Sequence, residues 1–543
     1  MDSHVVRYRS VLHATVAPHG DHDLHQKATV RPSADPLHEL KTVFMREKTR
    51  FDQRIQTALR WIFAATAIAA SIHGVFSGEI LVFALSEASI VVAYAGARAA
   101  RNGRDAIIAT HPAILFVTTT YLYSSLHGNI VPEGLNEPKT ALLITLVYQG
   151  SVIIGLFFAD LLEGVFTSST SAKIETQFSK SGLDALSAAR FPLIALGVVG
   201  LLIAHQFEGS GPLTSIFSLL MWLGMATHFA QRRGVLPLDW VTVFIIGLTA
   251  VIAISANARS ALFETLLFLG FAHLMFARRL FTLAQVVAGL LLIRAISVFS
   301  DIMLSVRWLR QISTARMVEQ ALDYLFSIET LSALVNPFYV SEAQAVWAKA
   351  IDPNSQFTSH FFVGNISTLQ RFTLLPQMDL ILHGLRTDSI RWSAILNIPL
   401  SQLPDIGQQK DLIFSDRITW ELGLRAYGNI GRPMVTAAGE FYAMGGLAPL
   451  IVLTVVLFTS YFIVLRILKA AIGSDQIVTL VFSQLIVATL ISTTAIGAYG
   501  VVFRTIPALV VFVGMIKYFV AQDSRKRLSA PPAIRPQHGK NIE

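Results

Sequence analysis

The 543-residue chain contains no cysteine, and only 14% of its residues are charged. The absence of cysteine excludes disulfides, thiolate metal ligands and a cysteine nucleophile. The shortage of charge is matched by an excess of apolar residues, which make up 53% of the chain. A soluble protein of this length cannot hide so much apolar surface, because its exterior must be largely polar. The composition therefore predicts a protein with many membrane-spanning segments.

The sequence also lacks the motifs of metal-dependent and nucleotide-dependent enzymes. It has no HExxH, no DxD pair in an external loop, no P-loop and no GxGxxG. We therefore expect neither a metal nor a cofactor, and ATP-driven or nucleotide-sugar chemistry has no support. The net charge of +8 indicates basic loops at a membrane surface, so we expect no binding to nucleic acid.

Long apolar runs without period-two alternation indicate helices rather than barrel strands. The predicted fold is an all-α polytopic membrane protein with about 12 transmembrane helices and a large, partly helical extracytoplasmic loop. The predicted spans lie near 59–76, 80–97, 105–125, 140–162, 190–206, 213–230, 237–254, 260–276, 280–299, 442–465, 476–496 and 500–521.

Basic residues follow every second predicted span, and the alternate loops carry almost none. Examples are Arg98, Arg101 and Arg104 after the second span and Arg466 and Lys469 after the tenth. Lysine and arginine are enriched in cytoplasmic loops, so this alternation predicts that both termini are cytoplasmic. The predicted regions are a cytoplasmic N-terminal extension (1–55), nine spans (56–299), an extracytoplasmic loop (300–440), three spans (441–522) and a cytoplasmic tail (523–543).

Arg259 ends a five-residue gap, SANAR, between two apolar runs. The alternation places this gap on the outer face, where the topological bias does not call for a basic residue. An arginine beside free N–H groups at a helix N-terminus suits a phosphate or pyrophosphate. The alternative is a side chain that reaches the lipid headgroups without any further role.

Other charges are expected near the same face. Glu264 and Arg294 are candidates for an intramembrane pair, which would be structural or part of an anionic site. Arg504 begins the last span on the outer side and is a further candidate for that site.

The segment 300–440 supplies more candidates. Arg371 and Arg391 could assist in binding an anion, and His360 and His383 could act as a general base near an arginine cluster. The alternative for each of these residues is an ordinary surface or salt-bridge position.

Two short stretches resemble Wzy-type polymerases of O-antigen and exopolysaccharide repeat units. The turn SANARSAL (255–262) is similar to that family's small-small-Arg-small-x-Leu pattern, and GRPMVTAAGEFYAMGGL (431–447) is similar to its Gly-Glu-aromatic return to the membrane. The number of spans and the large second-half loop are also similar, whereas the polar N-terminal extension is longer than the family would lead us to expect.

The resemblance implies a metal-independent, inverting glycosyltransferase of the bacterial inner membrane. The donor would be an oligosaccharide on polyprenyl pyrophosphate, and the acceptor another lipid-linked repeat unit. Membrane lipids and a chain-length regulator protein would be further partners. Arg259 would bind the pyrophosphate, assisted by Arg371 or Arg391, and the base would be Glu440, a loop carboxylate or a loop histidine.

Three alternatives remain open from the sequence. The related O-antigen ligases share the hairpin arginine and typically use a loop histidine, for which His360 and His383 are available. A transporter or flippase for lipid-linked glycans would suit the number of spans, although no internal repeat is evident. A non-enzymatic scaffold or sensor would instead act through the N-terminal extension.

Overall fold

The computed structural model describes residues 36–127, 130–131, 135–166, 169–204, 211–231, 239–255, 259–276, 313–327, 373–385, 389–402, 414–422, 436–491 and 494–529, with short pieces between 282 and 295. The chain divides into two units, 1–46 and 47–543. The account below concerns the second unit.

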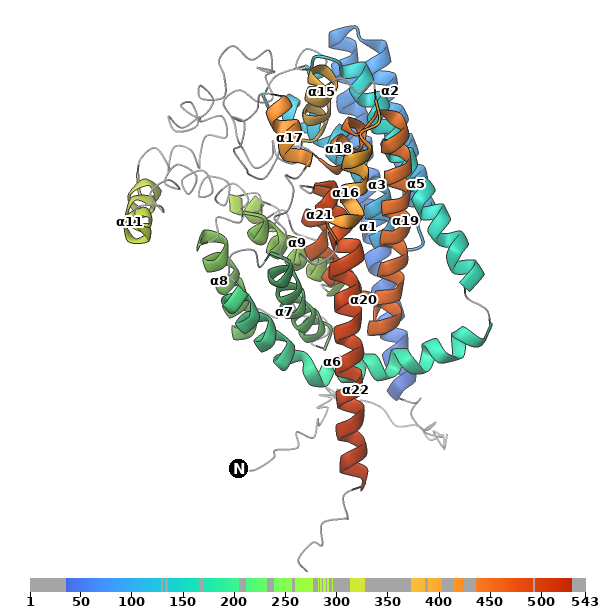
Figure 1. Ribbon diagram of the computed structural model, residues 1–543, viewed down its shortest axis with the longest axis vertical. Coiled ribbons are helices and arrows are strands. Elements are labelled where there is room, and N and C mark those ends of the chain that lie inside the picture. Colours follow the sequence, from blue (N-terminus) through green and yellow to red (C-terminus); the bar gives the residue numbers. More distant parts are fainter. Residues whose placement is uncertain are drawn as a thin grey trace, which may run out of the picture. The chain divides into compact units, whose positions relative to one another are not determined.

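The described elements of the structure are all helical (Figure 1). The helices before residue 330 are α1 (Pro36–Ser77), α2 (Ile80–Ala99), α3 (Gly103–Pro112), η1 (Ala113–Thr118), α4 (Thr119–His127), α5 (Pro138–Phe166), α6 (Ser169–Ala204), α7 (Gly211–Gln231), α8 (Trp240–Ser255), α9 (Arg259–Phe276) and α11 (Thr314–Leu325). Those after it are α15 (Leu375–Gly384), α16 (Trp392–Leu400), α17 (Phe414–Glu421), α18 (Ala437–Ala443), α19 (Leu447–Ile472), α20 (Asp475–Ile486), η4 (Val487–Ile491), α21 (Ala495–Gly500), η5 (Val501–Thr505) and α22 (Ile506–Ser529). The η elements are π-helical turns.

Seven helices in the described part are long and apolar enough to cross a membrane, so the class of all-α membrane protein holds. They are Arg50–Ser77, Ile80–Ala99, Gly103–Ser125, Pro138–Glu163, Asp184–Ile203, Leu447–Ile472 and Ala495–Val520. Four shorter apolar helices, from α7, α8, α9 and α20, coincide with further predicted spans. The predicted span over 280–299 lies mostly outside the described residues.

Two predicted boundaries differ from the observed ones for local reasons. The span predicted from residue 442 begins at Leu447, because Gly445 and Gly446 have positive φ angles and interrupt the helix. The break between the last two spans precedes Ala495 instead of falling at 496–500. The Thr494 hydroxyl accepts a hydrogen bond from the Gly497 N–H and so caps the new helix there.

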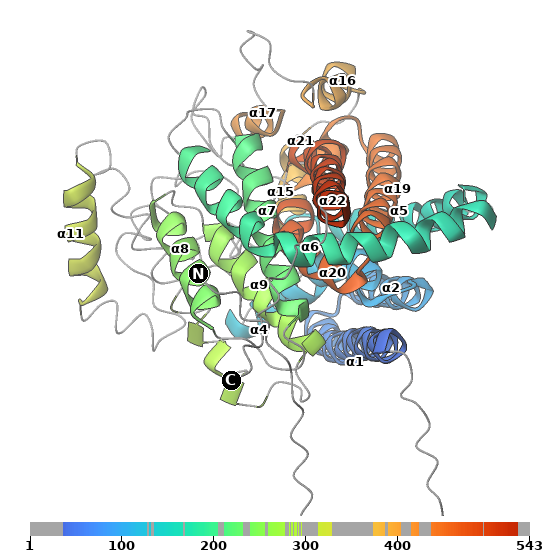
Figure 2. The same ribbon diagram turned by 90° about the horizontal axis from the view of Figure 1, so that it is seen from below.

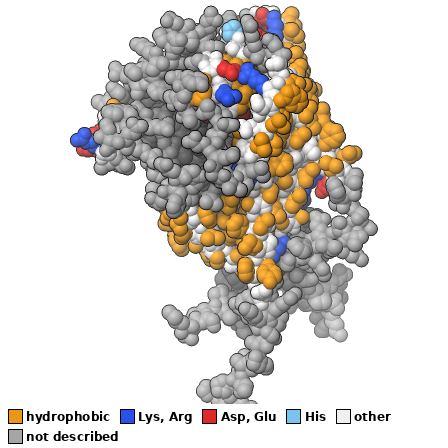
Figure 3. All heavy atoms as spheres, viewed as in Figure 1, with side chains coloured by type: hydrophobic (Ala, Val, Ile, Leu, Met, Phe, Trp, Pro, Cys, Tyr) orange, Lys and Arg blue, Asp and Glu red, His pale blue; other side chains and the backbone are white. Residues whose placement is uncertain are grey.

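Apolar side chains cover the outside of the helices as well as their interior. Trp61 on α1, Phe157 on α5 and Leu202 on α6 are examples of exposed large apolar residues. Figure 3 shows such side chains across much of the described face. A surface of this kind suits lipid, in which apolar side chains need no polar cover. By contrast, the residues from Gln476 to Ile486 of α20 are all buried, as expected for a helix that is packed on all sides.

Glycines allow α6 and α7 to approach each other closely. A Cβ atom at Gly197 would lie 2.5 Å from the Met221 nitrogen, and one at Gly224 would lie 2.8 Å from the Arg190 carbonyl oxygen. Small residues at helix contacts are typical of membrane proteins, because close backbone approach increases the van der Waals attraction.

The third span is interrupted at Pro112, which has no N–H to donate within the helix. The Gln149 side chain of α5 fills the break, because it donates to the Ala109 carbonyl and accepts from the Ala113 N–H. The π-helical turn η1 starts at this point. Downstream, the Leu115 carbonyl accepts hydrogen bonds from the Thr119 hydroxyl and from the Leu374 N–H, at 2.6 and 2.9 Å. The segment before α15 is therefore bound to the middle of this span.

Ion pairs join the helix ends that lie next to the loops predicted to be cytoplasmic. Arg101 pairs with Asp160 at 3.2 Å, and Arg466 pairs with Glu163 at 3.0 Å. The same four side chains also form the Arg101–Glu163 and Arg466–Asp160 pairs. Nearby, Asp475 has two basic neighbours. The fully buried Arg104 lies 3.4 Å from the Asp475 carboxylate, and Lys469 lies 3.9 Å from the same carboxylate. We call this region the ion-pair end.

Candidate functional site

Four short helices gather at the opposite end, where α5, α19 and α21 begin. α15 packs on α5 and α18, α16 packs on α21, and α17 packs on α18. α18 itself packs on both α19 and α21. We call this region the α18 end. Among the predicted site residues, Glu440 lies in α18 and His383 in α15, whereas Arg391 directly precedes α16 and Arg504 lies in η5, which follows α21.

Asp379 fastens α15 to the start of α5. Its carboxylate accepts hydrogen bonds from the Asn136 and Glu137 N–H groups, at 2.8 and 2.6 Å, and from the Asn136 side chain at 3.1 Å. These donors lie just before the helix and have no partners within it, so the carboxylate acts as a cap. Burial raises the pKa of Asp379, although these hydrogen bonds favour the charged form.

Glu440 lies inside α18 and is only 1% exposed. Its Oε2 accepts the Ala495 N–H at 2.8 Å, so the side chain connects α18 to the start of α21. Burial raises the pKa of Glu440 to about 8, and the nearby charge of Asp416 adds to the increase. The Ala495 N–H and the Ser415 hydroxyl act in the opposite direction. Near neutral pH this carboxyl group is therefore mainly protonated.

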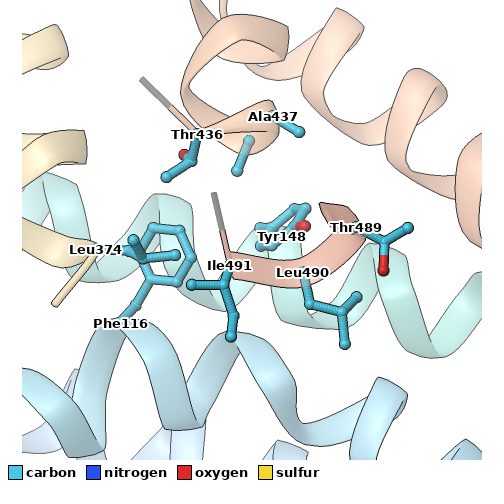
Figure 4. A pocket seen from close by; sticks show the side chains of 9 residues that line it. Phe116, Tyr148, Leu374, Thr436, Ala437, Thr489, Leu490 and Ile491 are labelled. Carbon is cyan, nitrogen blue, oxygen red and sulfur yellow. The ribbon is translucent and has the colours of Figure 1, made fainter. Parts of the chain in front are cut away.

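A small cavity lies between η1, η4 and the start of α18 (Figure 4). Its volume of about 10 Å³ is room for about one water molecule. The side chains of Tyr148, Thr436 and Thr489 provide its polar lining, and Phe116, Leu374 and Ile491 are among the apolar ones. The Tyr461 hydroxyl lies within hydrogen-bond distance of Thr489, at 3.2 Å. This cavity is too small to hold a sugar, so it is not a substrate pocket.

Arg391 precedes α16 and is partly exposed. Its Nη1 lies 3.1 Å from Glu421 Oε2, and its guanidinium lies 5.6 Å from the centre of the Phe414 ring. Both partners belong to α17, so Arg391 connects α16 to that helix. These two contacts fix the orientation of the Arg391 guanidinium, which could in this way bind an anion. In the structure, however, Glu421 is already its anionic partner.

Arg504 lies in η5 beside Gln402, which follows α16. A Cβ atom at Gly500 would lie 3.1 Å from Gln402 Oε1 and 3.4 Å from Arg504 Nη2. Within the described part of the chain, Arg504 Nε and Gln402 Oε1 are buried atoms without a hydrogen-bond partner. Such atoms are costly unless a further group completes their hydrogen bonds.

The SANAR gap has a helix on each side, and α8 packs against α9, which begins at Arg259. The Gln484 side chain donates to the Glu264 carbonyl at 2.7 Å, and the Arg54 guanidinium donates to the Leu274 carbonyl at 2.7 Å. The first contact places the start of α9 beside the end of α20. From there the chain leads through η4 to Ala495, the partner of Glu440. The start of α9 therefore lies toward the α18 end.

The remaining predicted site residues have different outcomes. His383 is exposed near the end of α15, where its charge acts on Asp379. The Arg259 side chain lies outside the described residues, and so do Arg294, Arg371 and His360. The proposed Glu264–Arg294 pair is therefore untested.

Sequence reasoning missed Asp379, Asp416 and Gln402 as members of the α18 end. Asp379 is a lone acid in the apolar stretch LLPQMDLIL, and this contrast is a signal that could have identified it. No local signal was available for Gln402, because its importance arises from its proximity to Gly500 and Arg504.

Comparisons with known protein families, with functionally characterised proteins and with solved structures find no match to this chain.

Proposed function

We propose that this protein is an inner-membrane glycosyltransferase that polymerises polyprenyl-pyrophosphate-linked oligosaccharide repeat units on the outer face of the membrane. One observation carries the proposal. The Gln484–Glu264 hydrogen bond brings the start of α9, and with it Arg259, toward the end of the bundle where Arg391 and Arg504 lie. Three arginines on one side of a membrane protein suit a lipid-linked pyrophosphate.

The proposal includes the predicted topology. About 12 spans would cross the membrane, residues 300–440 would be extracytoplasmic and both termini would be cytoplasmic. The gathering of basic loops at the ion-pair end supports this orientation, because such loops favour the cytoplasmic side. The α18 end would then face outward, where lipid-linked repeat units are polymerised.

The chemistry is a single displacement at the anomeric carbon of the donor. An acceptor hydroxyl forms the new glycosidic bond with inversion, while the bond from that carbon to the pyrophosphate oxygen breaks. Arginine side chains stabilise the charge that develops on the departing polyprenyl pyrophosphate. The hydroxyl proton passes to a base. No metal or cofactor takes part in this scheme.

Among the candidate bases, His383 is exposed and Glu440 is buried with a mainly protonated carboxyl group. A protonated carboxyl group cannot accept the acceptor's proton. We therefore assign Glu440 a positioning role, through its hydrogen bond to Ala495, and we place His383 before it as the candidate base. His360 and loop carboxylates remain candidates.

Replacement of Arg259 tests the proposal. Arg259→Ala should abolish long-chain polysaccharide and leave single lipid-linked repeats, as seen on a gel that resolves chain length. Arg259→Lys should also fail, because lysine cannot bind the pyrophosphate in a bidentate manner. Arg316→Ala, at an exposed position of α11, is the matched control and should leave the polymer unchanged. A normal ladder of chain lengths from Arg259→Ala would refute the proposal.

A further inference from the structure

We propose that α16 is an interfacial helix whose exposed face is immersed in the lipid beside the starts of α19 and α21. Through this helix the 300–440 segment would meet the membrane. This placement does not depend on the proposed transferase activity.

Each end of α16 is hydrogen-bonded to a residue near the start of a span. The Arg391 N–H donates to the Met444 carbonyl at 2.7 Å, three residues before α19 starts. At the other end, the Gln402 side chain donates to the Ile496 carbonyl at 3.1 Å, one residue after α21 starts. The helix therefore bridges the starts of the two spans instead of projecting away from them.

The chain just before α16 is also closely packed against the protein. A Cβ atom at Gly445 would lie 2.9 Å from the Ile390 Cα atom, so the backbone before α16 touches the turn before α19. The inward side chains Ala394 and Ile398 are buried. This face of α16 is thus occupied by protein, and the opposite face is the one available to a partner.

The opposite face is apolar. Trp392, Leu396 and Leu400 are 63%, 59% and 61% exposed, and they repeat every four residues. Residues at this spacing form one stripe along a helix. Figure 2 draws α16 at the edge of the helices, and α16 packs against α21. A stripe of large apolar side chains would be unfavourable in water, so it needs a cover.

The exposed apolar residues of the neighbouring spans indicate that lipid contacts this stripe. On one side, Leu447, Ile451 and Val452 of α19 are exposed, and on the other side Phe503 of η5 is exposed. These residues belong to two of the membrane-spanning candidates. Because α16 is hydrogen-bonded near the starts of both spans, its stripe lies at the same end of the bundle as these exposed residues. Trp392 at the start of the stripe is typical of the membrane interface, where its amphipathic ring is favoured.

Spin labelling tests the inference directly, because the chain has no cysteine of its own. We would introduce Leu396→Cys and Leu400→Cys separately into the full-length protein, attach a nitroxide and reconstitute the protein in nanodiscs. Val452→Cys, on an exposed face of α19, is the lipid reference. Arg417→Cys, at an exposed position of α17, is the water reference. Collision rates with oxygen and with a polar nickel chelate report on the environment of each label.

We expect the labels at 396 and 400 to resemble the label at 452, with frequent oxygen collisions and few nickel collisions. Nickel accessibility equal to that at 417 would overturn the inference, because α16 would then face water. Low accessibility to both reagents, with an immobilised line shape, would also overturn it in favour of a protein partner. Thermal unfolding of each labelled variant, compared with the parent, confirms that the labelled protein is folded. None of these readouts requires polymerase activity, so a failure here is separate from a failure of the proposed function.

Discussion

At the scale of single residues, Glu440 shows how one side chain can satisfy a structural need at an electrostatic cost. Its carboxyl group completes a hydrogen bond that the start of α21 cannot make within the helix. The same burial disfavours the charged form and raises the pKa of the group to about 8, well above its ordinary value of 4.5. The folded protein therefore holds a proton that the unfolded chain releases over this interval.

This difference predicts a specific dependence of stability on pH. Between about pH 5 and 8 the folded state binds more protons than the unfolded state, so stability should fall as the pH rises, by up to roughly 1.4 kcal/mol per pH unit. Glu440→Gln keeps an oxygen for the Ala495 N–H but cannot ionise. We expect the variant to lose most of this decline, as measured by thermal unfolding in detergent across the pH range.

The comparison between wild type and variant matters more than either curve alone, because burial also raises the pKa of Asp379. Parallel curves for wild type and Glu440→Gln would show that Glu440 does not carry the effect. Glu440→Ala should be less stable than Glu440→Gln at about pH 5, because it removes the oxygen that accepts the Ala495 N–H.

The sequence identified Glu440 but not its place in the structure. The Gly-Glu-aromatic pattern singled it out, and its predicted position before a span agrees with α18 preceding α19. Its burial could not be predicted, because it depends on α17 and α21 packing around α18. Those contacts join segments that are separated along the chain.

At the scale of elements, the turn between α18 and α19 determines where α16 can lie. Gly445 has a φ angle of +150°, and its missing side chain leaves room for the backbone at Ile390. Other residues rarely adopt such a conformation. The turn therefore combines a backbone requirement with a packing requirement at one residue.

Gly445→Ala should destabilise the protein by about 1–3 kcal/mol, because it adds both strain and a steric clash. Thermal unfolding in detergent is the measurement. Gly150→Ala is the matched control, since a Cβ atom there meets nothing within 4 Å and Gly150 lies in the regular helix α5. We expect that control to be unchanged or slightly more stable. Equal effects of the two substitutions would contradict the role of the Gly445 turn.

Apolar runs predicted most of the helices but none of the π-helical turns. A run such as 105–125 predicts a span from its length alone, and the observed span covers 103–125. The wide turn at η1 follows Pro112, which is visible in the sequence, but it also needs Gln149 from α5. A side chain that enters another helix leaves no periodic signal in either segment.

At the scale of the whole molecule, helix ends sort into two groups. The ends of α2, α5 and α19 meet at the ion-pair end, whereas the starts of α5, α19 and α21 meet at the α18 end. The regular spacing of basic residues along the sequence predicts that these two groups of ends lie on opposite sides of a membrane. The local charge pairs could not be predicted, because Asp160 and Glu163 are bound to Arg101 and Arg466, which lie in segments distant along the chain.

Cysteine labelling should give the orientation of these two ends. In right-side-out membrane vesicles, an impermeant maleimide should label Arg417→Cys directly and should label Arg98→Cys only after detergent is added. Both positions are exposed, and the parent chain provides a blank without cysteine. Labelling of Arg98→Cys in sealed vesicles would reverse the proposed topology.

The hydrogen bond between the Leu374 N–H and the Leu115 carbonyl has a consequence for biogenesis. During translation the third span emerges and inserts long before residue 374 is made. Until then the Leu115 carbonyl has the Thr119 hydroxyl as its partner, but it lacks the donor that the mature protein supplies. The third span is therefore among the first parts to enter the membrane, and its hydrogen bonds are among the last to be completed. In a ribosome-stalled chain that ends before residue 374, the Leu115 carbonyl should still lack this second hydrogen bond.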